Sequence, residues 1–304
     1  MVFLELIVDK KLGESEFGSE NRFYDIYSDA DVFHIVDQLG NGKPVIFNGG
    51  GVYAFVAANK EGLLRIGEAK GRSMLERPPV MAAEWDMVKP IVDWSNLKGK
   101  FDEKVLKQFF FKLHYTLPAV VIFPVIEEKA RELLTQTLGA DWAKRMIWKD
   151  KRVSTCAIDT LAYPGVNTLV HNAREQGFDA VYFTSANKPG EPTISNLKEV
   201  QKVFPGITVI EDQFMENTVS FHGKTGYNDW TSYTAIDVTL LPKGKMRLER
   251  IGSLSVQVLK DFSRSLLPGL EINDSDARKN LTTIPAFNCL PATKVLFKEI
   301  GSRF

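Results

Sequence analysis

Apolar positions along the chain follow two periods that alternate over most of its length. In residues 29–40 they recur at helical spacing, which predicts an amphipathic helix closed by Gly40. Residues 44–47 then form a short apolar run, typical of a buried strand. The same succession predicts further elements, namely helices over residues 102–113, 127–138, 166–176 and 196–204 and strands over residues 119–123, 180–183 and 207–210.

The pattern changes after residue 215, where strands follow one another with little helix between them. Residues 218–221, 233–239 and 246–251 are typical of such strands. Alternating βα units followed by consecutive strands favour a twisted sheet with parallel and antiparallel parts, with helices on its faces. We therefore expect an α/β protein with a mixed sheet rather than a purely doubly wound fold.

Three segments are predicted along the chain. Residues 1–25 form an acidic N-terminal segment, residues 26–256 form one α/β domain, and residues 257–304 form a C-terminal extension. A short helix begins near Leu259, but several prolines interrupt the remainder of that extension. We expect the extension to wrap the domain instead of forming a second core.

Composition and charge narrow the class of protein. The 304 residues include 38 Lys and Arg against 38 Asp and Glu, and the mean hydropathy is -0.13, as in soluble globular proteins. Zero net charge argues against a broad surface for polyanions, because such affinity comes from many cations that neutralise phosphates. Any anion site is therefore expected to occupy only a small part of the surface. Neither a signal peptide nor a membrane-spanning stretch is visible, so we expect a cytoplasmic protein with no membrane partner.

Several kinds of site find no support in the sequence. Cys156 and Cys289 are too few for a disulfide framework and lack metal-site spacing, and no two of the 4 histidines have the spacing of metal ligands. We therefore predict no protein-bound metal site. A Gly-x-Ser-x-Gly motif is also missing, which removes support for covalent hydrolase chemistry.

A glycine run directly after a predicted strand is the first candidate site. Gly49, Gly50 and Gly51 follow Asn48, and glycines let backbone N–H groups approach a phosphate or carboxylate closely. A tight turn is the alternative, because the spacing matches neither a Walker loop nor a G-x-G-x-x-G turn.

Two groups of cations are further candidates. Lys70 and Arg72 flank Gly71, and the pair suits a polyphosphate because a guanidinium can bind it in bidentate fashion. Arg247 and Arg250 lie on the predicted strand at residues 246–251. They can face the same ligand-binding cleft as Lys70 and Arg72. The alternative for the first pair is a surface loop.

Small polar residues follow the strand at residues 180–183. Thr184, Ser185 and Asn187 stand at its carboxyl end, where open α/β sheets bind ligands, and hydroxyl and amide groups can bind ribose, phosphate or a carboxylate. A polar turn is the alternative reading.

In their order along the chain, these features resemble the YrdC-like family, whose best-known members are threonylcarbamoyl-adenylate synthases. Residues 184–193 are close to the S-A-N-x-S-G-E-P-S pattern, which is the most specific match. The other similar segments are residues 45–55 (P-T-D-T-V-Y-G-L), 66–72 (I-x-x-x-K-x-R), 233–238 (S-T-V-V-D-L) and 247–254 (R-x-L-R-x-G-x-I). The resemblance covers roughly residues 26 to 256.

The resemblance implies a sheet curled around a concave, positively charged cleft that binds ATP. The synthases of the family convert ATP, bicarbonate and L-threonine into threonylcarbamoyl-adenylate and pyrophosphate, which feeds a tRNA modification. Related domains make a carbamoyl-adenylate from carbamoyl phosphate. The resemblance therefore implies a nucleotidyltransferase whose partners are a nucleotide and an amino acid or carbamoyl donor, with Mg²⁺ accompanying ATP.

The resemblance also implies roles for individual residues. Lys70 and Arg72 would be catalytic and hold phosphates or carbonyl oxygens. The nucleotide would be bound by Ser185, Asn187, Arg247 and Arg250. The remaining substrate would lie against Gly49, Gly50, Gly51, Tyr53 and Thr184.

The chain departs from the family pattern mainly on the acceptor side. Gly49–Gly51 replaces Thr-Asp-Thr, Ser73 replaces a proline, Ala157 stands where an arginine is expected, and Tyr233 replaces a serine. The phosphate-binding pairs are retained. Two alternatives to an enzyme therefore stay open: a non-catalytic nucleotide- or RNA-binding protein, and an assembly protein that docks through its segment from about Val256. The oligomeric state is not predicted.

Overall fold

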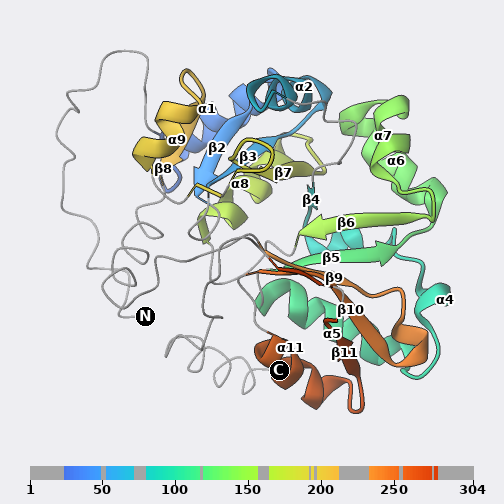
Figure 1. The fold of residues 1–304 in the computed structure, drawn as a ribbon. Coiled ribbons are helices and arrows are strands. Elements are labelled where there is room, and N and C mark those ends of the chain that lie inside the picture. Colours follow the sequence, from blue (N-terminus) through green and yellow to red (C-terminus); the bar gives the residue numbers. More distant parts are fainter. Residues whose placement is uncertain are drawn as a thin grey trace, which may run out of the picture.

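The structure is a computed structural model that describes residues 24–48, 53–71, 80–116, 119–156, 164–191, 193–194, 197–211, 233–252, 256–275 and 277–279. In this part of the chain, 12 strands form one sheet and helices pack on its faces (Figure 1). The sheet contains both parallel and antiparallel neighbours. The predicted α/β class with a mixed sheet is thereby confirmed.

The strands are short, with up to seven residues each. Their bounds are β1 Tyr24–Asp25, β2 Val45–Asn48, β3 Tyr53–Ala57, β4 Val80–Ala82, β5 Ala119–Pro124, β6 Arg152–Cys156, β7 Val181–Ser185, β8 Thr208–Glu211, β9 Thr234–Asp237, β10 Lys245–Ile251, β11 Glu271–Asn273 and β12 Arg278–Lys279. The order across the sheet is β1-β8-β2-β3-β7-β4-β6-β5-β9-β10-β11, and β12 pairs with β10.

The sheet brings together strands that are distant in sequence. Strand β2 lies between β3, to which it is antiparallel, and β8, to which it is parallel. Strand β7 lies antiparallel beside β3, and β9 lies parallel beside β5. In Figure 1, β5 and β6 run across the view while β2 runs along its height, as expected for a strongly twisted sheet.

The helices differ widely in length. Their bounds are α1 Asp29–Gly40, α2 Lys60–Ala69, α3 Trp85–Val88, α4 Trp94–Leu97, α5 Glu103–Thr116, α6 Glu127–Leu138, α7 Ala140–Met146, α8 Pro164–Glu175, α9 Leu197–Val203, the short 3₁₀ helix η1 Leu241–Lys243 and α11 Val256–Leu266. Figure 1 shows α5 and α11 on the side of β9 and β10 that lies away from β2.

Helices cover both faces of the sheet around β2. Val45 and Phe47 pack in a cluster with the apolar residues of α1 and α8, whereas Ile46 packs in a second, larger cluster with those of α2, α5 and α6. Successive residues of a strand point to opposite faces. A strand that is buried on both sides is therefore apolar throughout, and this explains the uninterrupted run in the sequence.

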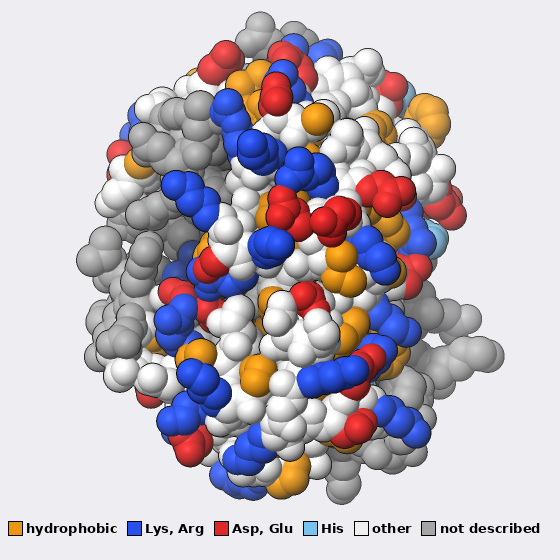
Figure 2. Space-filling model, turned by 90° about the vertical axis from the view of Figure 1, so that its right-hand side faces the viewer, with side chains coloured by type: hydrophobic (Ala, Val, Ile, Leu, Met, Phe, Trp, Pro, Cys, Tyr) orange, Lys and Arg blue, Asp and Glu red, His pale blue; other side chains and the backbone are white. Residues whose placement is uncertain are grey.

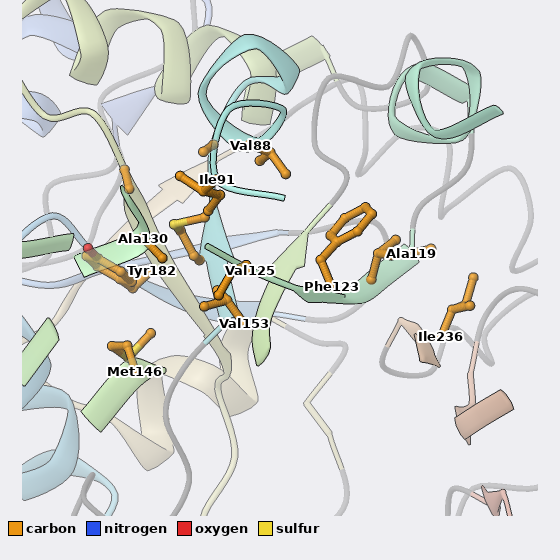
Figure 3. Close-up of a cluster of buried hydrophobic side chains, with 14 of the residues drawn as sticks. Val88, Ile91, Ala119, Phe123, Val125, Ala130, Met146, Val153, Tyr182 and Ile236 are labelled. Atoms are coloured by element: carbon orange, nitrogen blue, oxygen red, sulfur yellow. The ribbon is translucent and has the colours of Figure 1, made fainter. Parts of the chain in front are cut away.

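The larger cluster forms the main core (Figure 3). Phe123, Val153 and Tyr182 come from three strands of the sheet, and Met146 comes from α7. The rings of Phe110 and Phe123 meet edge to face, with centroids 4.8 Å apart. Aromatic side chains thus fill the space between α5 and the sheet.

The observed elements agree with most predicted ones. Helix α1 spans the predicted residues, α6 does so as well, and the two ends of β5 differ from the prediction by at most one residue. Strands β3, β4 and β6 fall outside the predicted pattern. They are three to five residues long, and β6 mixes polar with apolar residues, so neither period stands out. The predicted strand at residues 218–221 lies outside the described residues.

The described part of the predicted C-terminal extension packs on the domain. Leu259 and Leu267 belong to the main core, and the ring of Phe262 lies 5.5 Å from that of Phe109 on α5. Strand β11 extends the sheet beside β10. Residues 256–273 are therefore continuous with the domain in both sheet and core.

The molecular surface carries both signs of charge. On the face seen in Figure 2, basic and acidic side chains are interspersed, and hydrophobic side chains occur singly or in small groups. This face gives no single-sign field, in keeping with the balanced composition. No helix within the described ranges has the length and apolar character needed to cross a bilayer.

Candidate functional site

Helix α2 ends next to Lys70, whose side chain lies at the carboxyl end of strand β7. The side chain of Asn59 caps the first turn, because its Oδ1 accepts a hydrogen bond from the backbone N–H of Gly62 at 3.0 Å. Its Nδ2 donates to the carbonyl oxygens of Leu39 (3.1 Å) and Gly40 (2.9 Å) at the end of α1. One side chain thus joins two helices. Lys70 is the C-cap residue at the other end of α2.

The ammonium group of Lys70 is held against strand β7. Only 3% of the residue is exposed. Its Nζ donates to the carbonyl oxygen of Ser185 at 2.5 Å and lies 3.4 Å from Oγ1 of Thr184. The ring of Phe55 lies 6.0 Å away. A buried ammonium is costly without such partners, so the local structure is built around this charge. The predicted site residues Lys70, Thr184 and Ser185 are brought together.

The chain turns immediately after Lys70. Gly71 has a φ of 64°, a conformation that favours glycine. Arg72 lies outside the described residues, so its predicted partnership with Lys70 stays a prediction.

The glycine run connects two strands of a hairpin. Gly49, Gly50 and Gly51 lie outside the described residues, but the flanking Asn48 and Tyr53 pair across the antiparallel β2 and β3. In the same sheet, Ala54 pairs with Ser185. The glycine segment therefore begins and ends at the edge of the sheet where Ser185 and Lys70 meet.

Tyr53 serves mainly as part of the framework. Its side chain is buried in the main core. Its backbone N–H donates to the carbonyl oxygen of Ile194 at 2.9 Å, and its carbonyl accepts from the N–H of Ala186 at 2.7 Å. These bonds fix the loop after β7 against β3. A direct contact of Tyr53 with substrate stays a prediction.

Asn187 shapes the loop that follows β7. Its Nδ2 donates to the carbonyl oxygens of Lys188 (3.1 Å) and Glu191 (2.7 Å). Its Oδ1 is buried and has no hydrogen-bond partner in the described part of the chain. Buried polar atoms are normally paired, so an unpaired acceptor beside Ser185 is a feature that a ligand donor would satisfy.

Arg250 lies on another part of the sheet. Its Nε and Nη2 both donate to the carbonyl oxygen of Tyr233, at 3.0 and 2.8 Å. Burial raises the pKa of the nearby Cys156 thiol to about 12, although the positive charge of Arg250 opposes this shift. Strand β10 runs in the direction of β6 and opposite to β7. The carboxyl ends that carry Arg250 and Ser185 therefore point toward opposite edges of the sheet, and their convergence on one anion stays a prediction.

Arg247 is engaged by carboxylates of the protein. Its guanidinium lies 2.6 Å from Oδ2 of Asp237 and 2.7 Å from Oε1 of Glu249. Asp237 is fully buried and also receives Arg152 at 2.7 Å. The guanidinium of Arg152 stacks 4.4 Å from the ring centre of Trp148. Two arginines thus neutralise one buried carboxylate.

The sequence analysis did not predict the ion cluster formed by Arg152, Asp237 and Arg247. Arg152 belongs to a locally basic stretch that is typical of a solvated surface, and Asp237 stands in a strand motif of the family pattern. The contrast between one acidic residue and an otherwise apolar strand was the available signal, because a charge in such a strand needs a partner. The nucleotide-binding role of Arg247 stays a prediction.

The sequence predicted no metal site built by the protein. Within the described ranges, no three His, Cys, Asp or Glu side chains gather closely enough to hold a metal ion. His34 and His171 lie in α1 and α8, and His114 lies near the end of α5.

Comparison with solved structures shows which fold this is. The hypothetical protein smu.1377c from Streptococcus mutans UA159 aligns with a TM-score of 0.63 at 14% identity, over 83% of this chain and 97% of that one. Two structures of P. abyssi Sua5 are also similar. A double-alanine variant gives 0.56 at 18% identity over 83% of this chain, and the complex with L-threonine gives 0.54 at 16% identity over 91%.

The relatives are not all of the same length. This chain spans 65% of the first Sua5 structure and 74% of the second.

No curated protein matches the sequence. A family model, Sua5_yciO_yrdC, described as telomere recombination, matches residues 37–219. Because this match covers more than half of the 304 residues, the chain belongs to the Sua5/YciO/YrdC family.

Proposed function

We propose that this chain is an ATP-dependent nucleotidyltransferase that activates a carbamate as an acyl-adenylate. The observation that carries the proposal is the buried ammonium of Lys70 against Thr184 and Ser185, together with the buried Oδ1 of Asn187, which has no hydrogen-bond partner among the described residues. In this reaction, a carbamate oxygen bonds to the α-phosphorus of ATP and the bond to pyrophosphate breaks. Such transfer requires positioning and charge neutralisation more than a protein nucleophile.

The residues of the site are proposed to divide this work. Lys70 and Arg72 neutralise charge on phosphate or carbonyl oxygens. Ser185 and Asn187 bind the nucleotide, because an amide oxygen can accept a hydrogen bond from a ribose hydroxyl. Arg250 adds positive charge. Mg²⁺ is proposed to arrive with the phosphates of ATP, as this ion usually keeps several waters and few protein ligands.

The acceptor side is proposed to bind an amino acid. One similar structure is a Sua5 complexed with L-threonine, so threonine is the first amine to test. Gly49–Gly51 would face it without the hydroxyl and carboxylate groups of the family pattern. Tyr53 is buried in the core, and Thr184 is proposed to contact the amino acid. The proposed product, a threonylcarbamoyl-adenylate or a close analogue, would feed a tRNA modification in the cytoplasm.

The test is a product assay on the full chain. Purified protein is incubated with ATP, Mg²⁺, labelled bicarbonate and L-threonine, and in parallel with other amino acids or with carbamoyl phosphate. We expect release of pyrophosphate and a labelled adenylate. The absence of product with every amine and with carbamoyl phosphate would rule the proposal out.

A second candidate is a non-catalytic nucleotide- or RNA-binding protein. Two observations favour it. The Nε and Nη2 donors of Arg250 are already occupied by the carbonyl oxygen of Tyr233, and glycines stand on the acceptor side where the family pattern has polar side chains. Tight binding of ATP or RNA without pyrophosphate release, and unaffected by added amino acid, would support this candidate over the enzyme.

A further inference from the structure

A pocket lies between helix α11 and the strands β10 and β11. Its volume is about 610 Å³, within the range of sites for small molecules. It is formed by elements that follow the segment matched by the family model, which ends at residue 219. Helix α2, which carries Lys70, does not contribute to it.

Cations from two elements line this pocket. Lys260 and Arg264 are exposed and lie one helical turn apart on α11. Lys245 comes from β10, where its Nζ pairs with Oε2 of Glu271 at 3.1 Å. The lining holds three cations and one carboxylate, and Arg264 also pairs with Asp261, which is not part of the lining, at 3.3 Å. These five groups together carry a net charge of +1, which favours an anion.

A buried hydroxyl group also lines the pocket. Ser263 is 2% exposed, and its Oγ has no hydrogen-bond partner in the described part of the chain. A buried hydroxyl without a hydrogen-bond partner destabilises the folded state. A serine at this position is therefore unfavourable for folding alone, whereas a ligand oxygen would give it a partner. Ser263 lies between Lys260 and Arg264 on the same face of α11.

The rest of the wall contains the apolar side chains of Leu267, Leu270 and Ile272, together with Gly269 and the polar Asn273. We propose that this pocket binds a small organic phosphate of nucleotide size, with the phosphate at Lys260, Ser263 and Arg264 and the organic part against the apolar side chains. Charge-assisted hydrogen bonds to lysine and arginine are the usual means of holding phosphate.

The first test is calorimetric titration of the full chain with AMP and with adenosine, which lacks the phosphate. We expect AMP to bind and adenosine to bind at least tenfold more weakly. The double variant Lys260→Ala plus Arg264→Ala should weaken AMP at this site roughly tenfold or more, the loss of about 1.4 kcal/mol per factor of ten. Lys129→Ala, an exposed lysine on α6 outside the pocket, is the matched control and should bind AMP as the wild type does.

The same titrations in a Lys70→Ala background separate this pocket from the proposed ATP site. AMP binding that survives Lys70→Ala and is lost with the Lys260 and Arg264 substitutions supports the proposal. Unchanged AMP binding in the double variant overturns it, and so does equal binding of adenosine. Pyrophosphate release from ATP should be unaffected by the double variant, so failure of the proposed enzyme activity would be recognised independently.

Ser263→Ala gives a second readout that a purely structural serine would not produce. Removing an unsatisfied buried hydroxyl should leave the thermal midpoint of the free protein unchanged or raise it. AMP affinity should fall at the same time, by about threefold or more, for one lost hydrogen bond. An affinity for AMP equal to that of the wild type would overturn the assigned role of Ser263.

Discussion

At the scale of single residues, Lys70 combines burial with a position beside the proposed nucleotide. Replacing Lys70 by alanine should lower pyrophosphate release on the order of 100-fold, as for other groups that stabilise charge in a transition state. Nucleotide affinity should fall as well, whereas the fold should persist. Steady-state assays and thermal melts of Lys70→Ala and of the control Lys129→Ala measure this. Retained turnover with a lowered melting temperature would show that Lys70 is structural.

His114 is a second residue whose environment has a measurable consequence. It is 5% exposed, and burial lowers its pKa from 6.5 to about 4. Below pH 6.5 the unfolded chain therefore binds more protons than the folded one. The free energy of unfolding should fall as the pH drops from about 6.5 to about 4, by on the order of 3 kcal/mol from this group.

The variant His114→Phe isolates this contribution, because it keeps an aromatic ring beside Trp85 and removes the titrating group. Urea unfolding at several pH values should give a shallower pH dependence for the variant between pH 6.5 and pH 4. Identical slopes for the two proteins would contradict the assignment.

Variants of Asp237 and Arg247 distinguish a structural role of these charges from a role in nucleotide binding. Asp237→Asn leaves two guanidinium groups facing a neutral side chain, so we expect the unfolding free energy to fall by about 3 kcal/mol or more. Arg247→Ala should destabilise less, because Arg247 is partly exposed. Urea titration and pyrophosphate assays are run on both. A stable Arg247→Ala variant that loses nucleotide binding would show that Arg247 acts on the nucleotide.

At the scale of elements, Asn59 links the end of α1 to the start of α2 and so supports the position of Lys70. Asn59→Ala removes a helix cap and two further hydrogen bonds, which should cost about 2 kcal/mol. Asn41→Ala is the matched control, because its side chain makes one exposed bond, and it should change stability by less than about 0.5 kcal/mol. Equal effects in urea unfolding would contradict the linking role.

The length of an element decided whether it could be predicted from the sequence. Helices α1 and α6 were predictable because each is three turns long, with a clear apolar face and a glycine at or after its end. Strands β3 and β6 were not, because short segments carry too few positions to establish a period. Single residues of the candidate site, such as Lys70 and Ser185, could be named from the sequence and their roles stay predictions, but their contacts could not be predicted. The bond from Lys70 to Ser185 spans 115 residues, and local periodicity contains no information about such pairs.

At the scale of the whole molecule, the described C-terminal segment is part of the fold. Leu259 and Leu267 are fully buried in the main core. Removing residues 256–304 should therefore abolish the cooperative thermal transition and lower solubility, as measured by circular dichroism and sedimentation. Leu259→Ala alone should cost about 2–5 kcal/mol. A truncated chain that melts like the full one would instead favour a separate docking arm.

The order of strands in the sheet has a consequence for synthesis of the protein. Strand β2 is made early, yet its parallel neighbour β8 ends at Glu211, and β5 waits for β9, which begins at Thr234. Until those later strands leave the ribosome, the nascent chain presents unpaired strand edges that can associate with other chains. Folding of the sheet is therefore expected to finish only after β9 has been translated, and the chain is expected to depend most on chaperones before that point.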